Sequence, residues 1–150
     1  MVTAYELSHV SPFAGLSEGE LEIIVPLCEE VICRRGEALF REGQMAERVY
    51  ILLEGKVTIQ VQLTSRPENV TVAISDRADN LVGWSGLVAP YCYTASAICQ
   101  ADSRLVAVDG QSLLRVLGQD AQMGFVVIQR IAEVISSRLR NTRAALLKTM

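Results

Sequence analysis

Short segments of alternating apolar and polar residues fill the chain between positions 31 and 108, which is the pattern of half-buried β-strands. Gly36, Gly43 and Gly55 separate several of these segments, and the polar residues 65–69 predict a hairpin loop. Many short strands at intervals of about 8–12 residues favour a β-sandwich or jelly roll over alternating strands and helices. The predicted strands cover residues 31–33, 38–40, 48–53, 56–63, 69–75, 94–99 and 105–108.

Helical periodicity flanks this β region on both sides. Residues 16–30 predict a helix in which Ser17 is the N-cap, Glu20 completes a capping box, and Pro26 bends or ends the helix. Residues 110–118 predict a second short helix. The apolar face of the first helix consists of Leu21, Ile24, Val25 and Leu27.

The strongest helical pattern covers residues 120–148, which contain no proline. At about 1.5 Å per residue this helix is roughly 40 Å long. A chain of this size has an expected radius of gyration of about 15 Å, so one small roll cannot cover the whole apolar stripe. We expect part of the stripe to meet a second copy in a homodimer; the alternative is a helix that lies wholly on its own domain. The stripe consists of Phe125, Ile128, Ile131, Ile135, Leu139 and Leu146.

Length and composition narrow the class of protein. The 150 residues suffice for a single domain spanning positions 1–150, and half of them are hydrophobic, with a mean hydropathy of +0.27. No uncharged apolar run of about 18 residues predicts a membrane span, and the N-terminal segment does not resemble a signal peptide. Four cysteines without a Cys-x-x-Cys pair favour a reduced, cytoplasmic protein. The net charge of −3 provides no general attraction to nucleic acid.

The segment from Val82 to Cys99 carries the most informative motif. Gly83 and Gly86 bracket two residues, and an apolar run leads to the sequence Tyr93-Thr94-Ala95. This segment resembles the phosphate-binding cassette of cyclic-nucleotide-binding domains, a family that includes the bacterial catabolite activator and FNR-like regulators. In that cassette a strand ends in Gly-Glu, half a helical turn follows, and an Arg-(Ser/Thr)-Ala begins the next strand.

Two further segments strengthen the resemblance. Residues 36–43 resemble the first hairpin of the family, and residues 49–57 resemble the strand-turn-strand that follows it. The order of elements, helix, β-roll, helix and long helix, is also that of the family. The resemblance implies a mostly β domain with helices: a double-stranded β-helix, or jelly roll, over residues 31–108, and a C-terminal dimerisation helix over residues 120–148.

The cassette departs from the family at its two charged positions. Trp84 stands where the family has the glutamate that accepts hydrogen bonds from the ribose, and Tyr93 stands where it has the arginine that pairs with the phosphate. Losing one partner of a buried charge pair costs about 2–5 kcal/mol, or roughly thirtyfold to several thousandfold in affinity. We therefore predict weak or absent binding of cyclic AMP and cyclic GMP.

The backbone of the turn can still offer amides to an anion. Arg77 or Arg143 could supply a cation from a different direction, unless both are solvated. By alignment, Thr142 and Arg143 lie near the helix positions that face the base in the catabolite activator. The predicted ligand-binding residues are Gly83, Trp84, Ser85, Gly86, Leu87, Tyr93, Thr94, Ala95, Thr142 and Arg143.

Three functions remain open at this point. The first is a free-standing sensor that binds a small ligand, nucleotide-like or not, other than a standard cyclic nucleotide. The second is an interaction module whose pocket is plugged by Trp84, and the third is the sensor part of a CRP/FNR-type transcription regulator. No helix-turn-helix follows Met150, so we expect no DNA binding by this chain alone.

We expect no enzymatic activity. His9 is the only histidine, and the sequence contains no recognisable Ser-His-acid, Cys-His or paired-carboxylate arrangement. Cys28 and Cys33 do not have the spacing of an iron–sulfur site. We therefore predict no catalytic residue, metal ion or cofactor.

Overall fold

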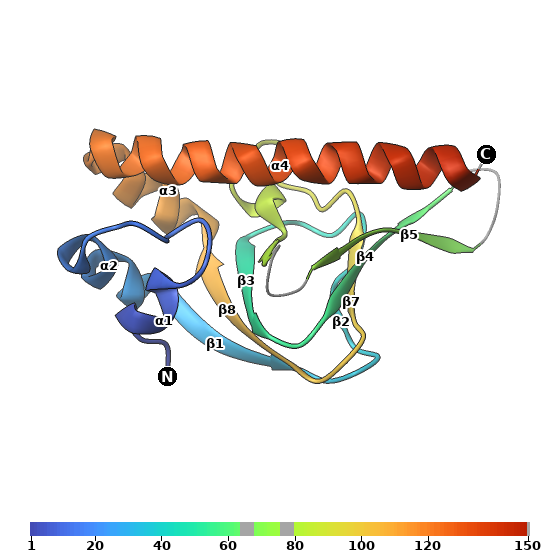
Figure 1. Ribbon diagram of the computed structural model, residues 1–150, viewed down its shortest axis with the longest axis horizontal. Helices are drawn as coiled ribbons and strands as arrows, with labels where there is room; N and C mark the ends of the chain where they lie inside the picture. The colour runs from blue at the N-terminus through green and yellow to red at the C-terminus, as the bar shows by residue number, and fades with distance from the viewer. Residues whose placement is uncertain (64–67, 76–79, 150) are drawn as a thin grey trace.

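Two four-stranded antiparallel sheets form the β-roll of the protein, as the computed structural model shows for residues 1–63, 68–75 and 80–149 (Figure 1). The first sheet has the order β1 (Cys28–Cys33), β8 (Ser103–Asp109), β3 (Arg48–Glu54) and β6 (Leu81–Val82). The second has the order β2 (Ala38–Phe40), β7 (Ser96–Cys99), β4 (Val57–Gln62) and β5 (Asn69–Ser75). The predicted jelly-roll fold is confirmed.

Strand β3 is buried on both faces, and its alternation separates the two hydrophobic cores. Val49 and Ile51 face the helices, whereas Tyr50 and Leu52 face the interior of the roll between the sheets. β3 pairs with β8 in antiparallel register, with Val49 opposite Val108. The first sheet therefore separates a core made with the helices from a core made with the second sheet.

The helices cover one end of the roll and then one side of it. They are α1 (Ala4–Ser8), α2 (Glu18–Ile24) with the 3₁₀ turn η1 (Val25–Leu27), α3 (Gly110–Gln119) and α4 (Ala121–Thr149). Figure 1 shows α4 running along the whole length of the molecule, over α3 at one end and beside β5 at the other. None of the helices in the described ranges combines the length and hydrophobicity needed to cross a bilayer.

The capping box predicted for the first helix is present, with Ser17 and Glu20 each bonding the other's backbone amide. The predicted end of that helix is wrong. Regular α-helix ends at Ile24, Pro26 lies in the 3₁₀ turn, and residues 28–30 belong to β1. Cys28 pairs with Val108 at the start of a six-residue ladder, so sheet pairing overrides the helical periodicity there.

Smaller differences concern short elements. The sequence analysis did not predict α1, which has five residues, or β6, which has two. The strand predicted from position 94 begins at Ser96. Most of the predicted hairpin loop at 65–69 lies outside the described residues, and Asn69 is already the first residue of β5.

The apolar stripe predicted on the last helix divides between two faces. Ile131 is buried against the helical core, together with Met123 and Val127. Phe125 and Leu139 are each 68% exposed, and Ile128 is 45% exposed. A helix that packs on its own domain along its full stripe would hide these residues, so α4 presents a second apolar face to the outside.

Candidate functional site

A tight turn between β6 and β7 forms one wall of the candidate site. It begins at Gly83, whose φ of 80° lies in the left-handed region that favours glycine, and continues as the 3₁₀ turn η2 (Trp84–Gly86). A Cβ at Gly83 would lie 2.9 Å from the Phe40 ring. The glycine is therefore required both by the backbone conformation and by the neighbouring aromatic ring.

Gly86 and Leu87 build the turn, and neither is among the described residues that line the two pockets beside it. The amide of Gly86 donates to the Gly83 carbonyl at 3.2 Å, and the amide of Leu87 donates to the Trp84 carbonyl at 2.8 Å. A Cβ at Gly86 would lie 2.8 Å from the backbone of Arg48, and the Leu87 side chain is buried in the helical core. These two amides therefore hold the turn together.

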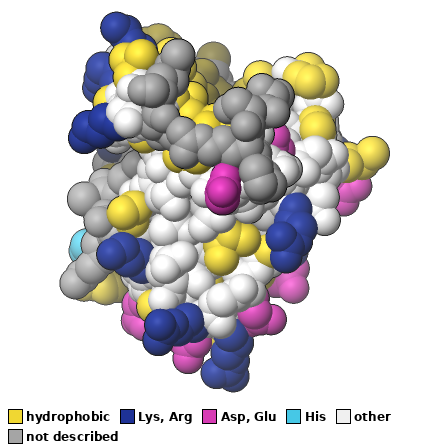
Figure 2. Space-filling view, turned by 90° about the vertical axis from the view of Figure 1, so that its right-hand side faces the viewer, with side chains coloured by type: hydrophobic (Ala, Val, Ile, Leu, Met, Phe, Trp, Pro, Cys, Tyr) yellow, Lys and Arg dark blue, Asp and Glu magenta, His cyan; other side chains and the backbone are white. Residues whose placement is uncertain are grey.

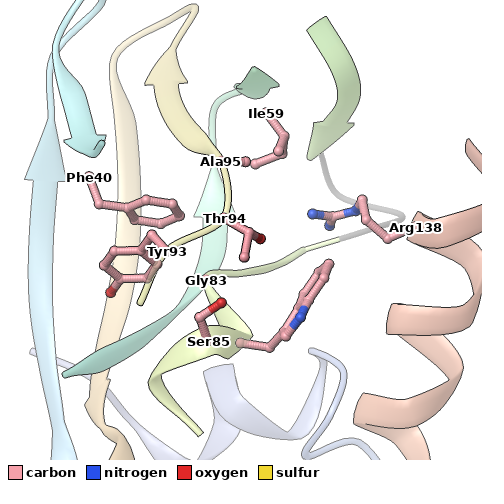
Figure 3. Close-up of a pocket in the computed structure, with 9 residues that line it drawn as sticks. Phe40, Ile59, Gly83, Ser85, Tyr93, Thr94, Ala95 and Arg138 are labelled. Atoms are coloured by element: carbon pink, nitrogen blue, oxygen red, sulfur yellow. The ribbon is translucent and has the colours of Figure 1, made fainter. Parts of the chain in front are cut away.

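Tyr93 lies inside the roll, 5% exposed, with its ring stacked on Phe40 at a centroid distance of 3.8 Å and an interplanar angle of 10°. Its hydroxyl donates to the backbone carbonyl of Arg48 at 2.6 Å and points away from Arg138 in Figure 3. Burial raises the pKa of this phenol to about 12. Tyr93 thus fills the place of the family's arginine as a neutral, hydrogen-bonded ring.

The cation at this site comes from α4. Arg138 is 3% exposed, and its Nη2 donates to the backbone carbonyl of Leu81 at 2.8 Å. Its guanidinium carbon lies 5.2 Å from the centroid of the Trp84 ring, within the range of a cation–π contact. Arg138 is not among the ligand-binding residues predicted from the sequence. The available signal was its position seven residues after the buried Ile131, in phase with the inward face of α4.

Two adjoining pockets lie between the turn and α4. The inner pocket, of about 40 Å³, is lined by Phe40, Ile59, Gly83, Trp84, Ser85, Tyr93, Thr94, Ala95 and Arg138 (Figure 3). The outer pocket, of about 260 Å³, is lined by Ile59, Val61, Val72, Trp84, Thr94, Ala95, Ile135, Arg138, Leu139 and Thr142. Among these described lining residues, Arg138 is the one that carries a charge.

Most of the residues predicted to bind a ligand surround these pockets. Thr142 lines the outer pocket, whereas Arg143 is exposed and lines neither. Figure 2 shows Lys and Arg beside hydrophobic side chains at the upper left, over the C-terminal end of α4. Arg77 lies outside the described residues. The residues from the cassette that line the inner pocket are Gly83, Trp84, Ser85, Tyr93, Thr94 and Ala95, and their binding role stays a prediction.

Comparison with known proteins identifies the family. The profile of the cyclic nucleotide-binding domain matches residues 30–120, which include the cassette and seven of the eight strands in full. The chain belongs to the cyclic nucleotide-binding domain family. The resemblance based on the cassette and the two hairpin segments is therefore confirmed.

Individual relatives include a transcriptional regulator and a cyclic nucleotide-binding protein. The chain is 24% identical over 136 residues to a CRP-like cAMP-activated global transcriptional regulator of Mycobacterium tuberculosis, covering 91% of this chain and 58% of that regulator. The structure matches a cyclic nucleotide-binding protein from Geobacter metallireducens with a TM-score of 0.79 and 27% identity, covering 93% of this chain and 99% of the other.

A third match shows the fold alone, because its identity is only 18%. It is a mutant regulatory subunit of a cAMP-independent protein kinase A from Trypanosoma brucei, with a TM-score of 0.77 and coverage of 97% of this chain and 50% of the other. The three matched proteins are thus a transcriptional regulator, a cyclic nucleotide-binding protein and a kinase regulatory subunit.

Proposed function

We propose that this domain is a sensor that binds a small ligand other than cyclic AMP or cyclic GMP in the two pockets between the cassette turn and α4. The observation that carries this proposal is the source of the buried cation: Arg138 of α4 lines both pockets, whereas the cassette positions hold Trp84 and Tyr93. The site keeps the turn of the family's cassette, but its positive charge comes from α4 instead of from the segment before β7.

The inner pocket argues against a standard cyclic nucleotide. Its volume of about 40 Å³ is small for a cyclic phosphate fused to a ribose. Tyr93 donates its hydroxyl hydrogen to the Arg48 carbonyl and carries no positive charge for a phosphate. The indole N–H of Trp84 can donate but cannot accept a hydrogen bond from a ribose hydroxyl.

The exposed face of α4 supports a homodimer. In coiled coils, apolar side chains that repeat at alternating steps of three and four residues form the contact between the helices. The exposed face of α4 has this spacing, and it includes Phe125 and Leu139, two of the most exposed large apolar side chains of the described residues. Pairing with a second copy would remove these side chains from water. The heptad positions, called the α4 seam below, are Phe125, Ile128, Ala132, Ile135, Leu139, Thr142 and Leu146.

The α4 seam meets the outer pocket, which suggests how ligand binding would be transmitted. Ile135, Leu139 and Thr142 belong to the seam and also line that pocket. A ligand that contacts them differently in two arrangements of the helix pair shifts the population toward the arrangement it binds better. The output of the sensor would then be a change in the geometry of the dimer.

Calorimetry on the purified protein tests the ligand part of the proposal. We expect no micromolar binding of cyclic AMP or cyclic GMP, and tight binding of either would contradict the proposal. A thermal-shift screen of nucleotides, lipids and aromatic acids searches for the actual class of ligand. A compound at about 100 times its dissociation constant should stabilise the fold by about 2.7 kcal/mol.

Light scattering coupled to size-exclusion chromatography tests the dimer. Phe125→Glu places a charge on the α4 seam, outside both pockets, and we expect it to convert the dimer into a monomer. Leu147→Glu is the matched control, because Leu147 is 59% exposed on the same helix but lies off the seam. A monomeric wild type, or equal effects of both substitutions, contradicts pairing through this seam.

A second candidate function is a ligand-free docking module. The narrow inner pocket and the ring of Tyr93 stacked on Phe40 favour this alternative, because they leave little room where the family holds a phosphate. It predicts that no compound in the screen stabilises the protein. It also predicts that a bulky substitution in the pockets, such as Ala95→Leu, leaves the docking of a partner protein unchanged.

A third candidate is the sensor part of a CRP/FNR-type regulator, favoured by the alignment with the mycobacterial protein, of which this chain spans 58%. Gel-shift assays with the natural polypeptide test DNA binding directly. We propose no catalytic activity and place the domain in the cytoplasm, where its four free thiols stay reduced. Persistence of all four thiols in protein isolated from cells, measured by alkylation, is the expected result.

A further inference from the structure

Polar groups line the inner pocket on two opposite sides. Ser85 comes from the cassette turn and Thr94 from the segment before β7, and Figure 3 shows Arg138 extending from α4 toward them. The hydrogen bond from Arg138 to the Leu81 carbonyl fixes the guanidinium in this position. A cation held in place before binding loses little conformational entropy when an anion arrives.

The outer pocket has the opposite character. Its walls are mostly aliphatic or aromatic, and its volume of about 260 Å³ is several times that of the inner pocket. Most of a ligand part that enters it must be apolar, because a polar group that does not reach Thr94, Arg138 or Thr142 would leave water without gaining a hydrogen-bond partner there. The apolar walls come from Ile59, Val61, Val72, Trp84, Ile135 and Leu139.

The two pockets share Arg138, Trp84 and Thr94, so one molecule can occupy both. We propose that the ligand is an apolar monocarboxylate, a fatty or aromatic acid, with its carboxylate in the inner pocket beside Arg138 and its apolar body in the outer pocket. This inference rests on the proposed sensor function and names the chemical class of its ligand.

Size and charge both favour a carboxylate as the head group. The inner pocket is small, with a volume of about 40 Å³, and a carboxylate is one of the smallest anionic head groups. Guanidinium and carboxylate form charge-assisted hydrogen bonds that are about twice as strong as neutral ones. The hydroxyls of Ser85 and Thr94 can donate to the same oxygens. A neutral alcohol of the same length fits the space but gains no charge-assisted bond.

The chain contains a single tryptophan, Trp84, and it lines both pockets. Its fluorescence therefore reports on the site directly, in the unmodified protein. The probes are decanoate and decanol, titrated below the concentrations at which they aggregate. We expect a saturable change in Trp84 emission with decanoate, and binding of decanol that is about thirtyfold weaker or more.

Two substitutions test the separate parts of the site. Arg138→Met keeps an unbranched side chain about as long as the aliphatic part of arginine and removes the charge, so decanoate should bind about thirtyfold more weakly or worse, while decanol is not weakened. Arg140→Met is the matched control, because Arg140 is exposed two residues further along α4 and contacts Ser136. Ala95→Leu narrows both pockets and should weaken decanoate and decanol alike.

Circular dichroism establishes whether each variant is folded. If Arg138→Met does not fold, the comparison of decanoate with decanol in the wild type and the Ala95→Leu variant still decide the question. Equal affinity for the acid and the alcohol overturns the assignment of the carboxylate. Decanoate binding that neither Arg138→Met nor Ala95→Leu changes overturns it as well, since the acid would then bind elsewhere, for example on the α4 seam.

The failure of this inference can be told apart from failure of the sensor function. If another compound of the screen changes Trp84 emission but neither acids nor alcohols do, the proposed sensor function is kept and the proposed ligand class is wrong. If no compound binds in the pockets, both the ligand class and the sensor are wrong, and the docking module is favoured.

Discussion

The two ends of α4 are buried against different surfaces. Toward its N-terminus, Met123, Val127 and Ile131 are at most 4% exposed and lie in the apolar core made by the helices and the first sheet. Toward its C-terminus the inward face carries Arg138 and borders two pockets above the roll. One end is a dry apolar contact, and the other holds a buried cation beside a mostly apolar pocket.

This difference suggests that the two parts of α4 have different roles. A close-packed apolar interface resists change, because any displacement opens cavities. An interface that contains a pocket can gain contacts when a ligand fills it. We therefore interpret the N-terminal part of α4 as the anchor and the C-terminal part as the segment that responds to ligand.

The largest expected effect breaks the anchor. Met123 is 1% exposed, so Met123→Ala removes buried methylene groups and leaves a cavity that should lower the free energy of unfolding by about 2–5 kcal/mol. The matched control is Leu147→Ala at the other end of α4, where the side chain is 59% exposed and the expected change is within about 0.5 kcal/mol. Urea unfolding measures both, and similar values would refute the distinction between the two ends.

The next effect concerns the pocket end, at the cassette turn. Gly83→Ala places a Cβ at positive φ and 2.9 Å from the Phe40 ring. Gly36→Ala is the control for backbone strain alone, because Gly36 has a φ of 87° and nothing within 4 Å of its would-be Cβ. We expect Gly83→Ala to destabilise the protein by about 1–3 kcal/mol more than Gly36→Ala. Equal destabilisation would mean that Phe40 and Tyr93 move aside freely.

Alkaline pH should weaken the pocket end specifically. Burial raises the pKa of Tyr93 to about 12 from a usual 10.0, so the fold favours the neutral phenol. The resulting stability is complete below pH 10 and is lost as the pH rises through about 12. Tyr93→Phe loses the hydrogen bond to the Arg48 carbonyl, but its free energy of unfolding should decline less steeply over this pH range. The measurement is the free energy of unfolding in urea from about pH 9 to about pH 11.5, a range in which the unfolded phenol titrates. If this free energy falls equally steeply in the wild type and in Tyr93→Phe, the assignment is contradicted.

Acid pH should weaken the ion pairs that join α1, β1 and β8, and here we expect the smallest effect. Hydrogen bonds from Arg104 lower the pKa of Glu30 to about 2 from 4.5 and also lower the pKa of Glu6. These carboxylates stabilise the fold above pH 4.5, and the contribution is lost as the pH falls toward 2. The three side chains are about a quarter exposed, so solvent screens their interaction. In Arg104→Gln the free energy of unfolding should fall less steeply as the pH is lowered. A pH dependence equal to that of the wild type would contradict this role of Arg104.

Much of the fold could be predicted because its signals are local. The capping box of Ser17 and Glu20, the period-two strands and the proline-free final helix each depend on neighbouring residues only. Residues 28–30 show where such signals fail: they directly follow a helical pattern in the sequence, but pairing with β8 decides their conformation. The short elements α1 and β6 carry too few residues for any periodicity to appear.

The candidate site could be predicted only on its cassette side. The glycines and the two aromatic replacements lie within one continuous segment, so their proximity follows from the chain itself. Arg138 lies more than 40 positions after Tyr93, and its spacing of seven residues from Ile131 indicates the inward face of α4 but not a place beside the cassette. Its role depends on how α4 lies across the roll, which is a property of packing between distant segments.

The sequence alone thus determined the family, the jelly-roll architecture, and the loss of the glutamate and arginine of the cassette, because each follows from residue types at short spacing. Only the tertiary structure decided which residue supplies the buried cation and which α4 side chains face outward. The physical reason is that burial and the position of a charge depend on contacts between segments far apart in the chain, and these contacts exist only once the helix has packed on the sheets.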